Sequence, residues 1–301
     1  MQALTGEPPL HIRRQQLSLN YIAKISSQKQ HPVFSHICNP GLPPNKKTKN
    51  STPLIDRIKL TNFDRSQLNV SLNINSNFPP WTNHPLTIDL TLTKYPKLTT
   101  NPTIIKHLFM EILDHYPKYL QIFTDASKTP NSHAAAYYSN VNSYSISIPT
   151  NCSILTGETT AILEALIFFK QSKTMKCIVI TDSLNALLGL KQMYTKNTIL
   201  QRIKNELETL RALGKEVVFI WVPSHAGIYG NEKADELANK SRMSANHTAK
   251  LKTYPCTDLK NLVKVHCTNT WQNHSEKICS KLKEIYTKID VVLDNPSNRR
   301  N

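Results

Sequence analysis

Four acidic residues occupy positions that a hydrophobic core would not ordinarily give to a charge. Asp125 follows the apolar run QIF, Asp182 follows the apolar run CIVI, and Glu158 lies in the first turn of the helix predicted between them. Asp235 comes ten residues after His225, in the stretch WVPSHAGIYGNEKADELA. A carboxylate at the end of a buried strand costs desolvation free energy unless it is paired or binds a metal. The set therefore predicts an acidic, metal-binding site with a histidine close by that could carry a proton.

Each of these residues also has an ordinary explanation when it is taken alone. An Asp after a strand usually belongs to a turn, and an acid near a helix start interacts favourably with the helix dipole. A single loop histidine is more often a surface residue than a proton carrier. Only the ordered set favours an active site. Whether its members meet in space depends on the strands and helices predicted around them.

The elements predicted around these residues form an alternating pattern. Three strand-like runs, KYLQIFTDAS, HAAAYYS and NSYSISI, predict an antiparallel meander. Helices and strands then follow in the order GETTAILEALIFFK, KCIVITD, SLNALLGLK, NTILQRIKNELETLRAL, EVVFIWV and NEKADELANK. Thr156 and Asn231 are the predicted N-caps of the first and last helices. The pattern predicts an α/β fold, and if the strands before Asp125 and Asp182 are neighbours, both carboxylates lie at one sheet edge.

These motifs resemble those of the type 1 ribonuclease H family. The matching stretches are FTDASK around Asp125, TGETTAILEAL around Glu158, ITDSLNAL around Asp182, and SHAGIYGNEKADELA with His225 and Asp235. The resemblance covers residues 113–245 and fills the family's four acidic positions in order. It implies a ribonuclease H-like fold with a five-stranded mixed sheet, three antiparallel strands followed by parallel strands, and helices on both faces.

The resemblance also implies an activity. The chain would be an endonuclease that hydrolyses the RNA strand of RNA/DNA hybrids and leaves 5′-phosphate and 3′-hydroxyl ends. Two Mg²⁺ ions, for which Mn²⁺ could substitute, would activate the attacking water and stabilise the leaving oxygen. By resemblance, Asp125 bridges both ions, Glu158 and Asp182 complete one, and Asp235 completes the other. His225 would assist proton transfer or product departure without being a permanent ligand.

Recognition of RNA requires contacts to 2′-hydroxyl groups across the minor groove of the hybrid. Ser127, Lys128 and Ser183 are the candidate substrate contacts. Two positions depart from the family pattern. Ala126 stands where Gly is common, which predicts strain if the position needs a positive φ, and Leu184 stands where Gln is common, which predicts the loss of one polar contact.

A related family requires exclusion because integrases and transposases share this fold and use two aspartates and a glutamate. Glu216 follows Asp182 by 34 residues, close to the spacing of those enzymes. Glu216 opens the predicted strand EVVFIWV instead of lying on a following helix. We therefore interpret this spacing as a coincidence.

Basic residues are concentrated outside the ribonuclease H-like region. Residues 1–112 carry 13 basic and 5 acidic side chains, residues 113–245 carry 14 and 11, and residues 246–301 carry 10 and 5. We predict a weakly structured leader and linker over 1–112, a ribonuclease H domain over 113–245 and a basic helical tail over 246–301. The basic flanks could bind further nucleic acid.

The leader and the tail contain some local patterns. RRQQLSLNYIAKI places Leu17, Tyr21 and Ile25 on one helical face, whereas NPGLPPNKKTKNSTP is typical of a linker. SLNINSNF and LTIDLTL alternate like two short strands, but the sequence indicates no partner for them. In the tail, Leu259, Leu262 and Val263, and then Ile278, Leu282 and Ile285, have helical spacing.

The motif style and both flanks resemble the C-terminal part of non-LTR retrotransposon polyproteins, in which ribonuclease H follows a reverse transcriptase. Residues 1–112 would then include a remnant of that enzyme's C-terminal region. The chain contains no adjacent Asp-Asp pair of the polymerase type, so we expect no reverse transcriptase activity. Two alternatives stay open: a catalytically decayed, retrotransposon-derived nucleic-acid-binding protein, and a basic scaffold that binds through its flanks.

Cysteine usage and hydropathy bear on location. The six cysteines form no CxxC pair, and the first residues, MQALTGEPPL, lack the regions of a secretory signal. We therefore expect an intracellular protein of the nucleus or cytoplasm that is not secreted. Because no apolar run approaches the roughly 18 residues that span a bilayer, we expect no membrane partner.

Overall fold

The structure is a computed structural model that describes residues 8–35, 54, 61, 63, 85–243, 251, 253 and 255–277. The chain divides into two compact units. One unit combines Met1–Leu72 with Cys256–Asn301, and the other is Asn73–Pro255. The second unit contains every predicted site residue.

Six strands form one mixed sheet in the second unit. They are β1 (Thr87–Asp89), β2 (Leu120–Lys128), β3 (His133–Tyr138), β4 (Ser143–Ser147), β5 (Lys176–Thr181) and β6 (Glu216–Trp221). Their order across the sheet is β1-β6-β5-β2-β3-β4. Strands β2, β3 and β4 are antiparallel neighbours, whereas β2, β5, β6 and β1 are mutually parallel. The predicted mixed sheet is confirmed.

The predicted count of five strands is wrong because β1 adds a sixth. This strand lies within LTIDLTL and pairs in parallel with β6, with Ile88 opposite Phe219. Its three residues give a weak local signal, and its partner lies far along the chain, so local alternation could not identify the pairing. β1 precedes the predicted boundary at residue 113 but belongs to the same compact unit as the rest of the sheet.

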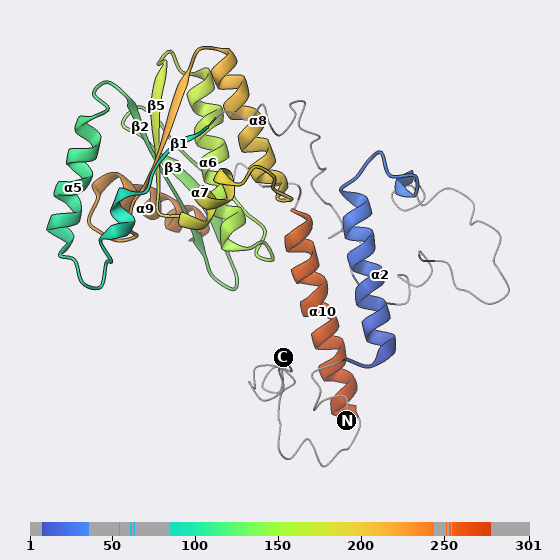
Figure 1. The fold of residues 1–301 in the computed structure, drawn as a ribbon. Coiled ribbons are helices and arrows are strands. Elements are labelled where there is room, and N and C mark those ends of the chain that lie inside the picture. The colour runs from blue at the N-terminus through green and yellow to red at the C-terminus, as the bar shows by residue number, and fades with distance from the viewer. Residues whose placement is uncertain are drawn as a thin grey trace. The chain divides into compact units, whose positions relative to one another are not determined.

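Helices cover both faces of the sheet, as predicted. The helical elements of this unit are η3 (Thr91–Lys94), α5 (Pro102–Asp114), α6 (Ile154–Gln171), α7 (Leu184–Lys191), α8 (Thr198–Ala212) and α9 (Tyr229–Met243). Residues of α6, α7 and α8 share one hydrophobic cluster with the sheet, whereas residues of η3, α5 and α9 share the other. Figure 1 shows α5, α6, α7, α8 and α9 around the strands.

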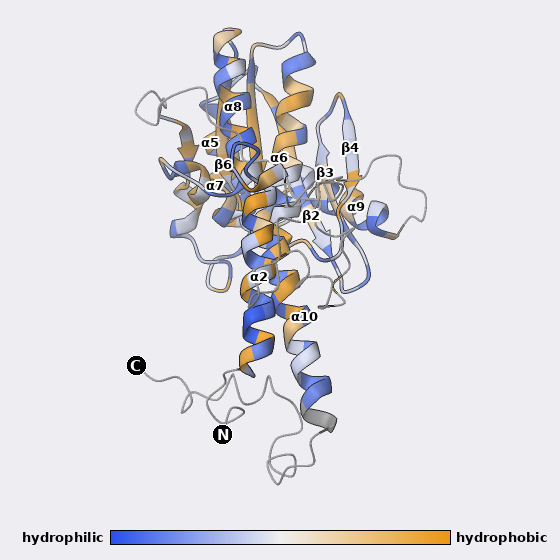
Figure 2. Ribbon diagram, turned by 90° about the vertical axis from the view of Figure 1, so that its right-hand side faces the viewer, coloured by the Kyte–Doolittle hydropathy of each residue, from blue (hydrophilic) through white to orange (hydrophobic). Residues whose placement is uncertain are grey.

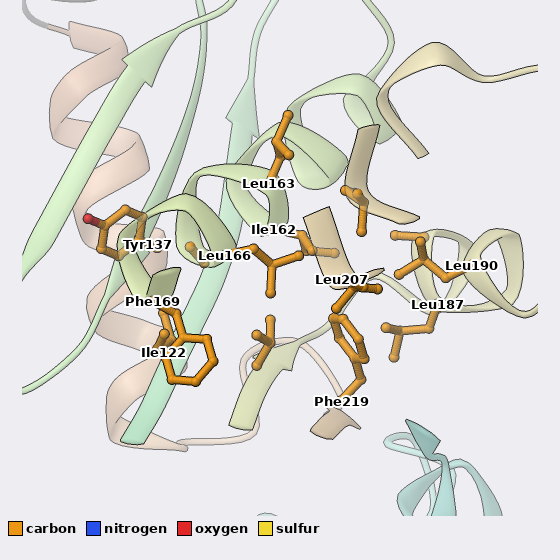
Figure 3. Close-up of a cluster of buried hydrophobic side chains, with 14 of the residues drawn as sticks. Ile122, Tyr137, Ile162, Leu163, Leu166, Phe169, Leu187, Leu190, Leu207 and Phe219 are labelled. Carbon is orange, nitrogen blue, oxygen red and sulfur yellow. The ribbon is translucent and has the colours of Figure 1, made fainter. Parts of the chain in front are cut away.

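The alternation of the strands divides the core between these two faces. Ile122 and Phe219 are buried against α6, α7 and α8, where Figure 3 shows them with Leu166 and Phe169. Their chain neighbours Phe123 and Ile220 belong to the opposite cluster. Because successive strand residues point to opposite faces, strands buried on both faces read as continuous apolar runs.

Two predicted helix caps are wrong. Helix α6 begins earlier than predicted, and Ser153 is its N-cap, whose side chain accepts a hydrogen bond from the Thr156 backbone N–H. Glu158 therefore lies in the second turn of α6 instead of the first. Asn231 lies inside α9 and is buried, so it does not cap that helix.

The first unit contains the helices α2 (Leu10–Ser26) and α10 (Cys256–Lys277), which run side by side. Hydrophobic residues occur on both helices (Figure 2), and the buried ones include Leu19, Ile22, Val263 and Trp271. The helical spacing of the tail is confirmed for Leu259, Leu262 and Val263, which lie on α10 in or against this cluster. The predicted face of α2 is wrong in part, because Ile25 is buried whereas Leu17 and Tyr21 are exposed.

Several predictions fall outside the described residues. These are the linker at 39–53, the run SLNINSNF, and the positions of Ile278, Leu282 and Ile285. Within the described part of the chain, Cys177, Cys256 and Cys267 are free thiols. None of the helices described is long and apolar enough to cross a bilayer.

Candidate active site

The pairing of β2 with β5 brings the first two predicted carboxylates together. The last parallel pair in this register is Thr124 with Thr181. Asp125 and Asp182 are the next residues of the two strands, so they are neighbours at the carboxyl edge of the parallel strands. Asp125 continues along β2, where it pairs with Ala136 of β3.

Two glycines allow helices to approach the sheet closely beside this pair. A Cβ at Gly157 of α6 would lie 2.8 Å from the Cβ of Ala126, and it would also clash with the His133 ring. A Cβ at Gly230, near the start of α9, would overlap the ring of Phe123. Side chains larger than hydrogen at these positions would move α6 and α9, and with them Glu158 and Asp235, away from β2.

Burial and mutual repulsion make Asp125 a strongly perturbed carboxyl. Burial is the largest cause and, with repulsion from Asp182, it raises the pKa of Asp125 to about 8. A hydrogen bond from the Ala126 backbone N–H, with an N to Oδ1 distance of 2.6 Å, opposes this rise. Asp235 and Glu158 add further repulsion. The four predicted carboxylates therefore share one electrostatic environment.

The pKa values of two neighbouring carboxyls, Asp182 and Glu158, are shifted in the same direction. Burial, followed by repulsion from Glu158, raises the pKa of Asp182 to about 6, while attraction to His225 opposes that rise. Burial also raises the pKa of Glu158, and a hydrogen bond from the Ser183 hydroxyl opposes it. Ionising these groups together is unfavourable unless a cation compensates for their charge.

The side chains of Trp221 and Ser183 hold the Asp182 backbone and the Glu158 carboxylate in place. The Trp221 indole Nε1–H donates to the backbone carbonyl of Asp182 at 2.9 Å. The Ser183 hydroxyl donates to Glu158 Oε2, and its oxygen also accepts from the backbone N–H of Ala186 at the start of α7. Ser183 is 4% exposed, so its side chain faces the carboxylate and not solvent.

Asp235 belongs to a second hydrogen-bonded chain that the sequence did not reveal. One turn further along α9, the Asn239 amide donates to Asp235 Oδ1 at 2.7 Å. The Asn239 carbonyl oxygen accepts from the Ser127 hydroxyl at 2.7 Å and from Arg242 at 3.1 Å. Asn239 therefore connects the TDASK strand to the fourth carboxylate. The spacing of four residues on a helix was the only sequence signal for this contact.

His225 lies on an exposed loop in a backbone conformation that non-glycine residues rarely adopt. Its φ is 50°, and its side chain is 68% exposed. Its Nδ1 atom lies 3.9 Å from Asp235 Oδ2, which is beyond hydrogen-bonding distance. The imidazole is therefore next to the acidic cluster but free to approach solvent.

Lys128 and Ala126, two other positions singled out in the sequence, lie in the same strand. The Lys128 ammonium donates to the carbonyl of Cys152. Ala126 lies in β2, and the described non-glycine residues with positive φ are Lys118 and His225. The strain considered for Ala126 is therefore absent, and its methyl group occupies the space beside Gly157.

Glu216 lies away from this cluster, at the start of β6 and therefore at the opposite edge of the parallel strands. Its carboxylate accepts from the Tyr119 hydroxyl at 2.7 Å and pairs with Lys176 at 2.9 Å. The spacing of 34 residues from Asp182 is therefore a coincidence, as interpreted, and the integrase-like arrangement is excluded.

The donor set fits a hard divalent cation. The charged neighbours that most affect Asp125 are three other carboxylates, and oxygen ligands with net negative charge are those that Mg²⁺ prefers. Among the described residues, however, no three Asp, Glu, His or Cys side chains already converge into a group that could hold a metal. The chemistry of the cluster thus supports metal binding, and the number of ions and their ligands belong to the proposal below.

Comparison with known proteins agrees with this arrangement. Residues 117–243 match the model of the RNase H family. No curated protein matches the chain. The four carboxylates and His225 all lie within the matched residues, as do strands β2 to β6 and helices α6 to α9. The domain formed by residues 117–243 belongs to the ribonuclease H family.

Proposed function

We propose that this domain hydrolyses the RNA strand of RNA/DNA hybrids and leaves 5′-phosphate and 3′-hydroxyl ends. The observation that supports this most directly is the register of β2 and β5, which places Asp125 beside Asp182. Glu158 and Asp235 are electrostatic neighbours of the same carboxyl. The family match supports the hydrolysis of hybrid RNA, and the ion count and product ends are inferred from the carboxylate set and the resemblance.

Asp125, Glu158, Asp182 and Asp235 would hold two Mg²⁺ ions, or Mn²⁺ in their place. Such ions supply an activated water and stabilise the leaving oxygen of an in-line phosphoryl displacement. The chain itself supplies the orientation of these ligands. Ser183 directs Glu158 through its hydroxyl, so we assign it a positioning role in addition to its predicted contact with substrate.

His225 would carry a proton to or from the reacting phosphate group. Its exposure and its 3.9 Å separation from Asp235 suit a side chain that moves between solvent and the cluster. Ser127 is the best placed of the predicted substrate contacts, because its oxygen can still accept a hydrogen bond from a 2′-hydroxyl while donating to Asn239. Lys128 would have to leave the Cys152 carbonyl to reach substrate.

The test is a substrate panel for the full chain with Mg²⁺. The proposal expects cleavage of the labelled RNA strand in a hybrid, and no cleavage of single-stranded RNA, duplex RNA or duplex DNA of the same sequence. Cleavage of duplex DNA, or of no substrate in either Mg²⁺ or Mn²⁺, would contradict it. The retrotransposon origin and the binding of other nucleic acid by the flanks stay predictions from the sequence.

A further inference from the structure

A segment that precedes the family match adds three lysines at the end of the sheet that carries the proposed active site. Residues 90–110 contain Lys94, Lys97 and Lys106 but no Asp or Glu. All three lysines are exposed. Within the described residues, none of them forms an ion pair. We call these three residues the lysine rim.

The parallel strands fix where this rim lies. β1 runs parallel to β6, so the chain leaves β1 at the carboxyl end of the parallel strands, where Asp125 within β2 and Asp182 just after β5 also lie. Helix η3, which contains Lys94, begins two residues after β1 ends. The carboxylate of Asp89, the last residue of β1, already accepts the backbone N–H of Thr91 at 2.7 Å.

Buried contacts attach the rim to the histidine loop. Leu92 of η3 and Ile105 of α5 are fully buried in the cluster that also contains Ala226 and Ile228. These two loop residues follow His225 closely in the chain. Lys94 of η3 and Lys106 of α5 therefore project from elements that pack into the same buried cluster as the loop of the proposed proton carrier.

Lys106 shows how close the two segments are. A Cβ built at Gly227 would lie only 2.7 Å from the Lys106 Nζ atom. The ammonium group therefore lies against the backbone two residues after His225. The Glu232 carboxylate also lies near Gly227, but among the described contacts it forms no ion pair with Lys106. The positive charge is consequently available to an external anion.

We propose that the lysine rim binds the phosphate backbone of the RNA/DNA hybrid beside the cleavage site, and so extends the substrate-binding surface beyond the residues of the family match. This inference rests on the proposed function, which supplies the polyanion. Three exposed cations that form no ion pair within the described residues, at the end of the sheet where a duplex would enter, complement the phosphates of a nucleic-acid backbone. Contacts to phosphate groups do not depend on the nucleotide sequence of the hybrid.

The test compares binding of a hybrid by full-length variants in an Asp182→Asn background, which prevents cleavage under the proposed function. Lys94→Gln/Lys106→Gln should bind the hybrid about fivefold to tenfold more weakly, and the slope of log affinity against log salt should fall by about one to two. The matched control Lys118→Gln/Lys173→Gln removes two exposed lysines from the opposite edge of the parallel strands. It should change affinity less than about twofold.

The charge-preserving variant Lys94→Arg/Lys106→Arg should retain the wild-type affinity, which separates charge from the packing of Lys106 over Gly227. Equal losses in the rim and control variants, or an unchanged salt slope in the rim variant, would overturn the inference. Cleavage by the otherwise wild-type chain is measured in parallel. If the chain cleaves hybrid but the rim variant binds normally, only the inference fails, whereas a chain that neither binds nor cleaves hybrid refutes the proposed function.

Discussion

Replacing Asp125 by Asn should stabilise the metal-free protein while it removes activity. Burial and three neighbouring carboxylates raise the pKa of this group from 3.8 to about 8. The folded state therefore binds its proton more tightly than the unfolded state does. The contribution of protonated Asp125 to the unfolding free energy is fully present below pH 3.8 and is lost as the pH rises towards about 8.

The pKa difference sets the expected magnitude. Between the unfolded pKa of 3.8 and pH 7 lie about three pH units, each equivalent to about 1.4 kcal/mol. The wild type should thus lose at most about 4 kcal/mol of unfolding free energy over this range because of Asp125. An Asn side chain does not ionise, so Asp125→Asn should recover most of this loss at pH 7 and almost none near pH 4.

The assay is calorimetric unfolding of the full chain with metal removed, at several pH values between 4 and 8. Glu216→Gln is the matched control, because it removes a carboxylate that is exposed and paired with Lys176. Its effect should stay within about 1 kcal/mol. Adding Mg²⁺ should stabilise the wild type more than Asp125→Asn, since binding to the folded state adds stability by mass action. A metal-free Asp125→Asn protein that is no more stable than the wild type at pH 7 would show that the Asp125 carboxyl is not destabilised by burial and repulsion.

Three other changes have defined outcomes. Gly230→Ala should lower the unfolding free energy by about 1–3 kcal/mol, measured by urea denaturation, because its Cβ would overlap the Phe123 ring; unchanged stability would contradict the close approach of α9. Asn239→Leu should lower kcat about tenfold and raise the Mg²⁺ concentration needed for half-maximal activity, because Asp235 loses its hydrogen bond; identical metal dependence would argue against a positioning role. His225→Ala should slow turnover less than loss of Asp235, as measured by steady-state hybrid cleavage, and an equal loss would make His225 as indispensable as a carboxylate.

The sequence was sufficient for the elements around the carboxylates. The apolar runs QIF and CIVI each lie in a strand and are each followed by a threonine and then by one of the acids. The pairing of Thr124 with Thr181 confirms that these strands are neighbours. Alternating strand and helix patterns are local and strong, because each element must bury an apolar face. The mixed sheet and its two helical layers follow from them.

Contacts between distant segments could not be predicted in the same way. β1 is three residues long and finds its partner only in the folded chain. The bonds from Trp221 to Asp182 and from Ser127 to Asn239 join residues that are 39 and 112 positions apart. No local pattern records such pairs, because they depend on register and on how closely α9 approaches β2. The prediction of the α6 N-cap was wrong for a different reason. Ser153 and Thr156 are both residue types that cap helices, so residue type alone did not distinguish between them.

We propose that Asp125 and its neighbouring carboxylates cut the RNA strand of a hybrid with the help of divalent cations. The most direct test compares hydrolysis of a hybrid with labelled RNA by the wild type, Asp125→Asn and Glu216→Gln in Mg²⁺, with identification of the product ends. We expect 5′-phosphate and 3′-hydroxyl products from the wild type and Glu216→Gln, and none from Asp125→Asn. Equal cleavage by Asp125→Asn, or no cleavage by the folded wild type, would contradict it.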